Sequence, residues 1–84
     1  MEVQHDEIDR HFILAIPEGK AVLDYERASD GRVIFTHTLV PVELRGRGIG
    51  ELLARAALTW ARKSNFVVEV HCSYVAHFLE KHPE

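Results

Sequence analysis

Three of the chain's five glycines, Gly46, Gly48 and Gly50, lie within five residues, where the hydrophobic pattern changes period. Before this point apolar and polar residues alternate, as they do in half-buried strands. After it, apolar residues recur at the spacing of an amphipathic helix, at Ile49, Leu52, Leu53, Ala56, Ala57 and Trp60. A glycine-rich joint between a strand and a helix is therefore the feature that most limits the folds open to this chain.

The segments on either side of this joint predict six elements. We expect strands at His11–Ile16, Lys20–Arg27, Arg32–Val40 and Phe66–His71, and helices from Ile49 to a C-cap at Asn65 and over Ser73–His82. Ser73 is the expected N-cap of the last helix, whose apolar face is Tyr74 or Val75 with Phe78 and Leu79. The order β-β-β-α-β-α predicts an α/β fold with a mixed sheet, because a strand-helix-strand unit adds its second strand in parallel by a right-handed crossover.

Length and charge narrow the classes of protein. The 84 residues predict a single domain, residues 1–84, and the net charge of -3 argues against general binding to nucleic acid or to a membrane surface. A lone cysteine, Cys72, excludes an intramolecular disulfide, and its spacing from the histidines fits no zinc signature, so we expect no metal. With no signal peptide or apolar run of about 20 residues, we expect a cytoplasmic protein, a monomer or a weak dimer.

The glycine-rich joint has the composition of an anion site. A helix N-terminus offers unpaired N–H donors and a partial positive charge, and glycines let a ligand approach the backbone closely. Arg45 and Arg47 add two positive charges to an otherwise acidic chain. The pattern is neither the dinucleotide fingerprint GxGxxG nor a P-loop with its Gly-Lys-Ser/Thr. A pyrophosphate cradle and a merely tight turn are both open readings of this stretch.

The stretch VPVELRGRGIGELL resembles motif A of the GNAT acetyltransferase superfamily, (Arg/Gln)-x-x-Gly-x-(Gly/Ala), at Arg45, Gly48 and Gly50. The wider blocks THTLVPVELRGRGIG and CSYVAHFLEKHPE resemble the small YjdJ-type N-acetyltransferases of that superfamily. The resemblance implies a minimal GNAT fold and an acetyl-CoA-dependent N-acetyltransferase acting on an amine. The alternative is a module that binds CoA or acyl-CoA with little turnover. That alternative arises because the chain lacks the helices that larger members place between their first two strands, and carries Phe78 where they place a tyrosine.

The resemblance also implies where acetyl-CoA binds. It would lie in a wedge between the Arg32–Val40 and Phe66–His71 strands, with backbone groups of Leu39 and Val40 beside its pantetheine arm. The loop that holds the pyrophosphate would be Arg45, Gly46, Arg47, Gly48, Ile49 and Gly50. The thioester would end near Cys72, Ser73 and Tyr74.

Three side chains are candidates for the chemistry. His37 can accept the amine's proton near neutral pH, or can be a strand histidine bonded to backbone. Cys72 stands where the positive end of a helix favours a thiolate, so it could carry the acetyl group, or it can be a small buried hydrophobe. Tyr74 could donate a proton to the departing thiolate, or it can be a core aromatic with its hydroxyl at the surface.

Overall fold

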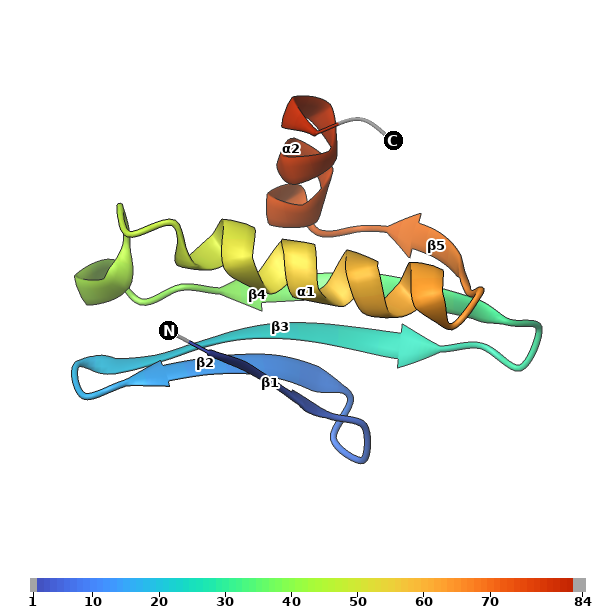
Figure 1. Ribbon diagram of the computed structural model, residues 1–84, viewed down its shortest axis with the longest axis horizontal. Coiled ribbons are helices and arrows are strands. Elements are labelled where there is room, and N and C mark those ends of the chain that lie inside the picture. The colour runs from blue at the N-terminus through green and yellow to red at the C-terminus, as the bar shows by residue number, and fades with distance from the viewer. Residues whose placement is uncertain (1, 83–84) are drawn as a thin grey trace.

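The computed structural model describes residues 2–82, in which five strands form one sheet that carries two helices (Figure 1). The elements are β1 (Val3–Asp6), β2 (His11–Ile16), β3 (Gly19–Arg27), β4 (Arg32–Leu39), the 3-10 turn η1 (Val42–Leu44), α1 (Ile49–Lys63), β5 (Val67–Val70) and α2 (Ser73–Lys81). The strand order is β1-β2-β3-β4-β5, with β1 to β4 antiparallel and β5 parallel to β4. The predicted mixed α/β sheet is confirmed.

The edge strand β1 is an element that the sequence alone does not predict. Its residues are mostly polar, so they show no apolar alternation. Its His5 takes the place of an apolar residue, because the imidazole stacks on Phe12 with ring centroids 4.0 Å apart. The His5 Nε2 also lies 2.6 Å from the hydroxyl of Tyr25 on β3. Pairing with β2 and packing on these rings, rather than intrinsic propensity, make this segment a strand.

The hydrophobic core lies between the sheet and α1, which runs across one face of it (Figure 1). The helix buries Ile49, Leu53, Ala54, Ala57, Leu58 and Ala61. The predicted face is therefore rotated, since Leu52, Ala56 and Trp60 are only half-buried. On α2, Val75 and Phe78 are buried, which settles the choice between Val75 and Tyr74 in favour of Val75. Neither helix of residues 2–82 has the length and apolar character to cross a membrane.

Both ends of α1 use left-handed backbone. Gly48 is the N-cap, with φ 75° and ψ 15°. At the other end Ser64 is the C-cap, and the predicted cap Asn65 is the next residue, with φ 60°. The Asn65 N–H donates to the Arg62 carbonyl at 3.0 Å and the Phe66 N–H to the Ala61 carbonyl at 2.9 Å. These two bonds form a Schellman motif, in which the left-handed residue follows the C-cap.

A β-bulge interrupts the pairing of β3 with β4. Asp24 pairs with His37 while its neighbour Tyr25 pairs with Phe35, so Thr36 is an extra residue in β4. The Thr36 hydroxyl donates to the Asp24 carbonyl at 3.3 Å. Because side chains alternate along a strand, the bulge sets which of the following β4 residues face the core.

Candidate functional site

The three clustered glycines are present for two different physical reasons. Gly46 and Gly48 have φ values of 81° and 75°, which L side chains rarely adopt, and a Cβ on either would meet nothing within 4 Å. Gly50 has no such φ, but a Cβ there would lie 2.7 Å from Cδ1 of Tyr74. The first two glycines therefore border open space that a ligand can enter, whereas the third makes room for a protein side chain.

The first turn of α1 offers backbone donors to that open space. The first helical bond is the one from the Leu52 N–H to the Gly48 carbonyl, at 3.1 Å, so the N–H groups of Ile49, Gly50 and Glu51 precede it. No side chain caps this end of the helix. The Ile49 side chain lies in the core, so Ile49 can contribute only its N–H to a ligand. Uncapped donors at the positive end of a 15-residue helix suit an anion.

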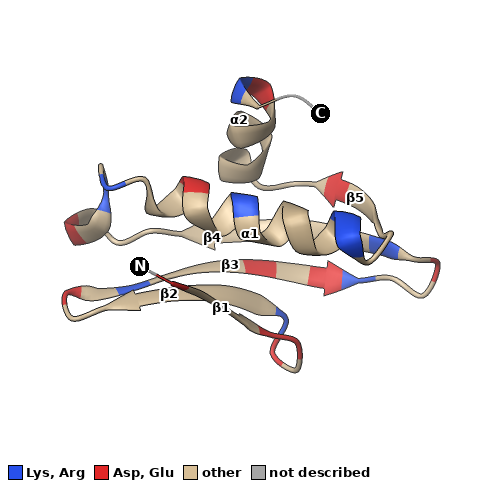
Figure 2. Cartoon of the chain, in the orientation of Figure 1, with Lys and Arg blue, Asp and Glu red and all other residues tan. Residues whose placement is uncertain are grey.

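Both arginines of the loop are exposed. The Nε of Arg45 donates to the carbonyl of Val40 at 3.0 Å and so ties the loop to the end of β4. The loop is flanked by acidic residues, Glu43 in η1 and Glu51 in the first turn of α1, and both signs of charge appear there in Figure 2. The Glu51 carboxylate lies 3.9 Å from Nζ of Lys81 on α2, which offsets part of its charge. The positive potential needed for a phosphate is thus confined to the loop itself.

The pairing of β4 with β5 stops partway along β4. Its last residue pair is Phe35 with Val70, and the His71 N–H then donates to the Phe35 carbonyl at 2.9 Å. Beyond this point β4 continues to Leu39, paired only with β3, while the other chain turns into α2. The β5-facing edge of β4 between residues 36 and 39 is therefore without a strand partner among the described residues. This is the place where the resemblance to the GNAT superfamily implies a wedge between the two strands.

A buried contact crosses that gap. Thr38 Oγ1 and Cys72 Sγ lie 2.8 Å apart, and Cys72 is 5% exposed. Cys72, and not the predicted Ser73, is the N-cap of α2, because its backbone is extended (φ −103°, ψ 129°) and Ser73 is already helical. Sequence reasoning misses Thr38, because its inward position follows from the bulge at Thr36, which the hydrophobic spacing does not show.

The candidate catalytic residues do not all share one side of the sheet. His37 is exposed and adjacent to buried Thr38, so it faces away from Thr38 and Cys72. Leu39 is 54% exposed on the same outer face as His37, whereas Val40 is buried. Tyr74 is 39% exposed on the first turn of α2. His37 and Cys72 thus stand on opposite sides of the gap between β4 and β5.

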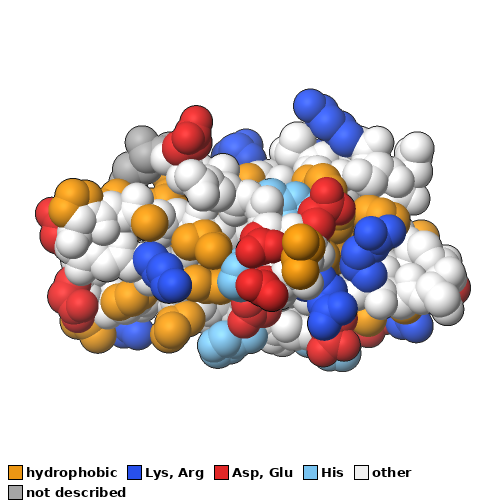
Figure 3. Space-filling view, turned by 90° about the horizontal axis from the view of Figure 1, so that it is seen from below, with side chains coloured by type: hydrophobic (Ala, Val, Ile, Leu, Met, Phe, Trp, Pro, Cys, Tyr) orange, Lys and Arg blue, Asp and Glu red, His pale blue; other side chains and the backbone are white. Residues whose placement is uncertain are grey.

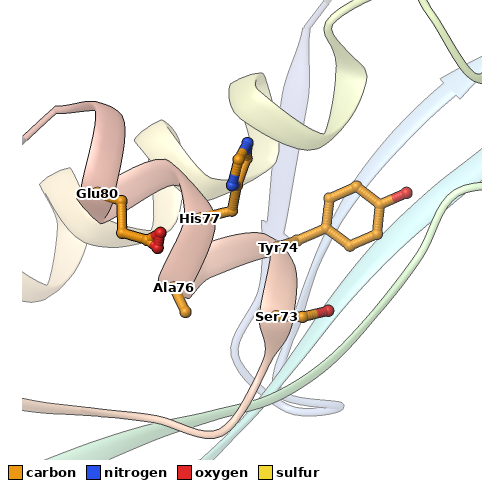
Figure 4. A pocket seen from close by; sticks show the side chains of 5 residues that line it. All are labelled: Ser73, Tyr74, Ala76, His77 and Glu80. Atoms are coloured by element: carbon orange, nitrogen blue, oxygen red, sulfur yellow. The ribbon is translucent and has the colours of Figure 1, made fainter.

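An open hollow of about 510 Å³ runs along α2 (Figure 4). It is lined by Ser73, Tyr74, Ala76, His77 and Glu80. Figure 4 shows the Tyr74 ring extending sideways from the first turn of the helix, away from Glu80 and Ala76, with the hydroxyl at its outer end. The hollow begins directly after Cys72, so it adjoins the gap.

A separate acidic cluster lies near the β1–β2 turn. Figure 3, which views the molecule from below, shows acidic side chains and a histidine gathered near the middle of the visible face. It contains Asp6, Asp9 and His11, whose ligand atoms lie within 4.8 Å of one another. Asp6 Oδ1 accepts the N–H groups of Ile8 and Asp9, and these hydrogen bonds, with that of Asp9 first, lower the pKa of Asp6. Asp6 thus has partners in the turn, and its other oxygen lies 3.8 Å from His11 Nε2.

Comparison with known proteins agrees with the architecture. The family model described as GCN5-related N-acetyl-transferase matches residues 11–84. Protein NATD1 of Bos taurus is 35% identical over 85 residues, which cover 99% of this chain and 75% of that protein. Protein NATD1 of Homo sapiens is 33% identical over 99% of this chain and 75% of its own length, and that of Danio rerio 33% identical over 99% and 77%. The chain belongs to the GCN5-related N-acetyltransferase family.

Proposed function

We propose that the protein transfers an acetyl group from acetyl-CoA to an amine. The observation that carries the proposal is the position of the loop: two left-handed glycines and an uncapped helix N-terminus follow, after the short turn η1, the strand whose edge is left free beside β5. A diphosphate fits the left-handed glycines and the uncapped helix N-terminus, and an extended arm that carries amide groups fits the free edge of β4. Membership of the acetyltransferase family supports the same assignment.

Acetyl-CoA would bind with its diphosphate on the loop of residues 45–50. Arg45 and Arg47 would add charge, and the N–H groups of Gly48, Ile49 and Gly50 would donate. The pantetheine arm would follow the free edge of β4 at Leu39 and Val40. The Val40 carbonyl already accepts a hydrogen bond from Arg45, so the exposed Leu39 is the better candidate for contact with the arm. The thioester would reach the gap beside Thr38 and Cys72.

Direct transfer requires a base for the amine and an exit for the thiolate. His37 would take a proton from the ammonium, the amine nitrogen would attack the thioester carbonyl, and the carbon–sulfur bond would break to release CoA thiolate. The outward position of His37 suits an acceptor that arrives from the open face of the sheet. A thioester in the gap can be reached from both faces, so Cys72 could instead take the acetyl group and pass it to the amine. Tyr74 remains a candidate proton donor for the thiolate.

A CoA-binding module with little turnover is the second candidate. The observation that favours it is the direct hairpin between β2 and β3, in which only Pro17 and Glu18 separate the strands. No element of this hairpin walls the outer face beside His37, so an acceptor would gain few contacts there.

We further propose a cytoplasmic location and a monomeric or weakly dimeric state, in keeping with the composition of the chain.

The test is native mass spectrometry of the protein with acetyl-CoA, followed by denaturation of the same sample and a panel of amines. A noncovalent complex that yields acetylated amine supports the enzyme. Equal binding of CoA and acetyl-CoA with no acetylated product supports the binding module. An acetyl adduct that survives denaturation and disappears in Cys72→Ala supports the covalent route. Absence of any complex overturns both candidates.

A further inference from the structure

Tyr74 and Gly50 form a pair that joins the two helices of the site. An added Cβ on Gly50 would lie 2.7 Å from Cδ1 and 2.8 Å from Cε1 of the tyrosine, closer than real Cβ contacts come. One edge of the ring therefore rests directly on the helix backbone at residue 50. Any side chain at this position would push the ring away.

This contact places the ring at the anion-binding end of α1. Gly50 is the second residue of the helix, and its N–H is among the uncapped donors of the first turn. Tyr74 is the second residue of α2, two positions after Cys72. The start of α2 therefore touches the gap through Cys72 and the phosphate-binding turn through Tyr74. Tyr74 keeps 39% of its surface exposed although its ring packs on Gly50.

Further contacts fix α2 over the N-terminal half of α1, as Figure 1 shows. The Arg55 guanidinium lies 5.2 Å from the centroid of the Phe78 ring, and Glu51 faces Lys81 at 3.9 Å. Both contacts come from the same half of α1 as Gly50. The position of Tyr74 is thus set by the packing of the two helices.

We propose that Tyr74 forms a wall of the diphosphate cradle, with its hydroxyl donating to a phosphate oxygen, and that Gly50 is the positioning residue that seats it. This inference rests on the proposed function. It gives Tyr74 a role in holding the nucleotide half of CoA, which differs from proton donation at the thiolate. It also explains why the first two glycines of the loop are needed for backbone conformation and the third for packing.

The test is a double-mutant cycle of Gly50→Ala and Tyr74→Ala, read by thermal denaturation and by calorimetric titration. The titrants are CoA and its nucleotide half, which keeps the diphosphate and lacks the pantetheine arm. Gly50→Ala is expected to lower the melting temperature in the wild-type background but not in Tyr74→Ala, where the ring is gone. Each single variant is expected to weaken binding of both titrants by about tenfold, the worth of one charge-assisted hydrogen bond, and the double variant by no more.

Two further variants separate the ring from its hydroxyl and from the rest of α2. Tyr74→Phe should keep the melting temperature, because the ring stays in place. It should weaken binding of the nucleotide half, because the hydroxyl that donates to the phosphate is gone. His77→Ala changes a neighbour in the same hollow and should leave that affinity unchanged.

Two results would overturn the inference while leaving the proposed function intact. One is an equal loss of melting temperature from Gly50→Ala in both backgrounds. The other is a Tyr74→Phe variant with unchanged nucleotide affinity and reduced turnover, which would return Tyr74 to the proton-donor role. A wild-type protein that binds neither titrant would instead overturn the proposed function.

Discussion

Gly48 is the position at which ligand binding can be separated from folding. Its φ is 75° and a Cβ would meet nothing within 4 Å, so a substitution costs backbone strain without a steric clash. Gly48→Val places a β-branched residue in the left-handed region, at a cost of roughly 1–2 kcal/mol. For a domain of this size, that cost lowers the melting temperature by about 4–16 °C.

Gly48→Asn is the sharper variant, because asparagine tolerates left-handed backbone and its strain should stay below about 1 kcal/mol. Its side chain would nevertheless enter the space through which a phosphate must approach the N–H groups. We expect CoA binding to weaken at least about tenfold, or about 1.4 kcal/mol, in calorimetric titration.

The chain supplies a matched control for this experiment at Gly31. That glycine has φ 87°, also has nothing within 4 Å of its added Cβ, and lies in the turn before β4. Gly31→Asn should carry the same small cost in stability and leave CoA affinity unchanged. The cradle would be refuted by a Gly48→Asn variant that binds CoA as tightly as Gly31→Asn does.

Three other perturbations test a contact in the gap and two features of the fold away from the site. Thr38→Val leaves the Cys72 thiol without its partner and should lower the free energy of unfolding in urea by about 0.5–1.5 kcal/mol, whereas Thr38→Ser keeps the hydroxyl and loses only what the buried methyl contributes. Burial lowers the pKa of His5, so its contribution to stability is complete above the unfolded value of 6.5 and is lost as pH falls through the lower folded value. Urea titrations on both sides of that pH should show this loss, and His5→Gln should reduce it. Asn65→Gly relieves the φ of 60° and should raise the melting temperature by a few degrees, since glycine gains up to about 1 kcal/mol there, while no gain would contradict the Schellman ending.

Elements with a strong hydrophobic period could be predicted from the sequence. The strand and helix patterns on either side of the glycine joint correspond to β2, β3, β4, α1, β5 and α2. β1 could not be predicted, because His5 is buried through ring contacts that only the folded sheet creates. The N-cap of α2 was displaced from Ser73 to Cys72 because backbone conformation, and not the usual preference for serine, decides it.

The candidate site could be located in outline, and its internal contacts could not. The glycine-rich stretch with Arg45 can be located from the sequence, because it immediately precedes a helical period and resembles motif A, and it lies at the N-terminal end of α1. The contact of Thr38 with Cys72 joins residues 34 positions apart, a relation that no local pattern encodes. The opposite facing of His37 and Cys72 depends likewise on the bulge at Thr36, which leaves no signature in hydrophobic spacing.

That bulge determines which face of the sheet each later residue of β4 points to. The one extra residue at Thr36 inverts the parity of the strand, so His37 and Leu39 point outward while Thr38 and Val40 point inward. Losing a single residue here would exchange the two sets, turning the Thr38 hydroxyl to solvent and the His37 imidazole into the core beside Cys72. A substitution in this segment alters one side chain, whereas a change of one residue in its length would exchange the side chains on both faces of the strand.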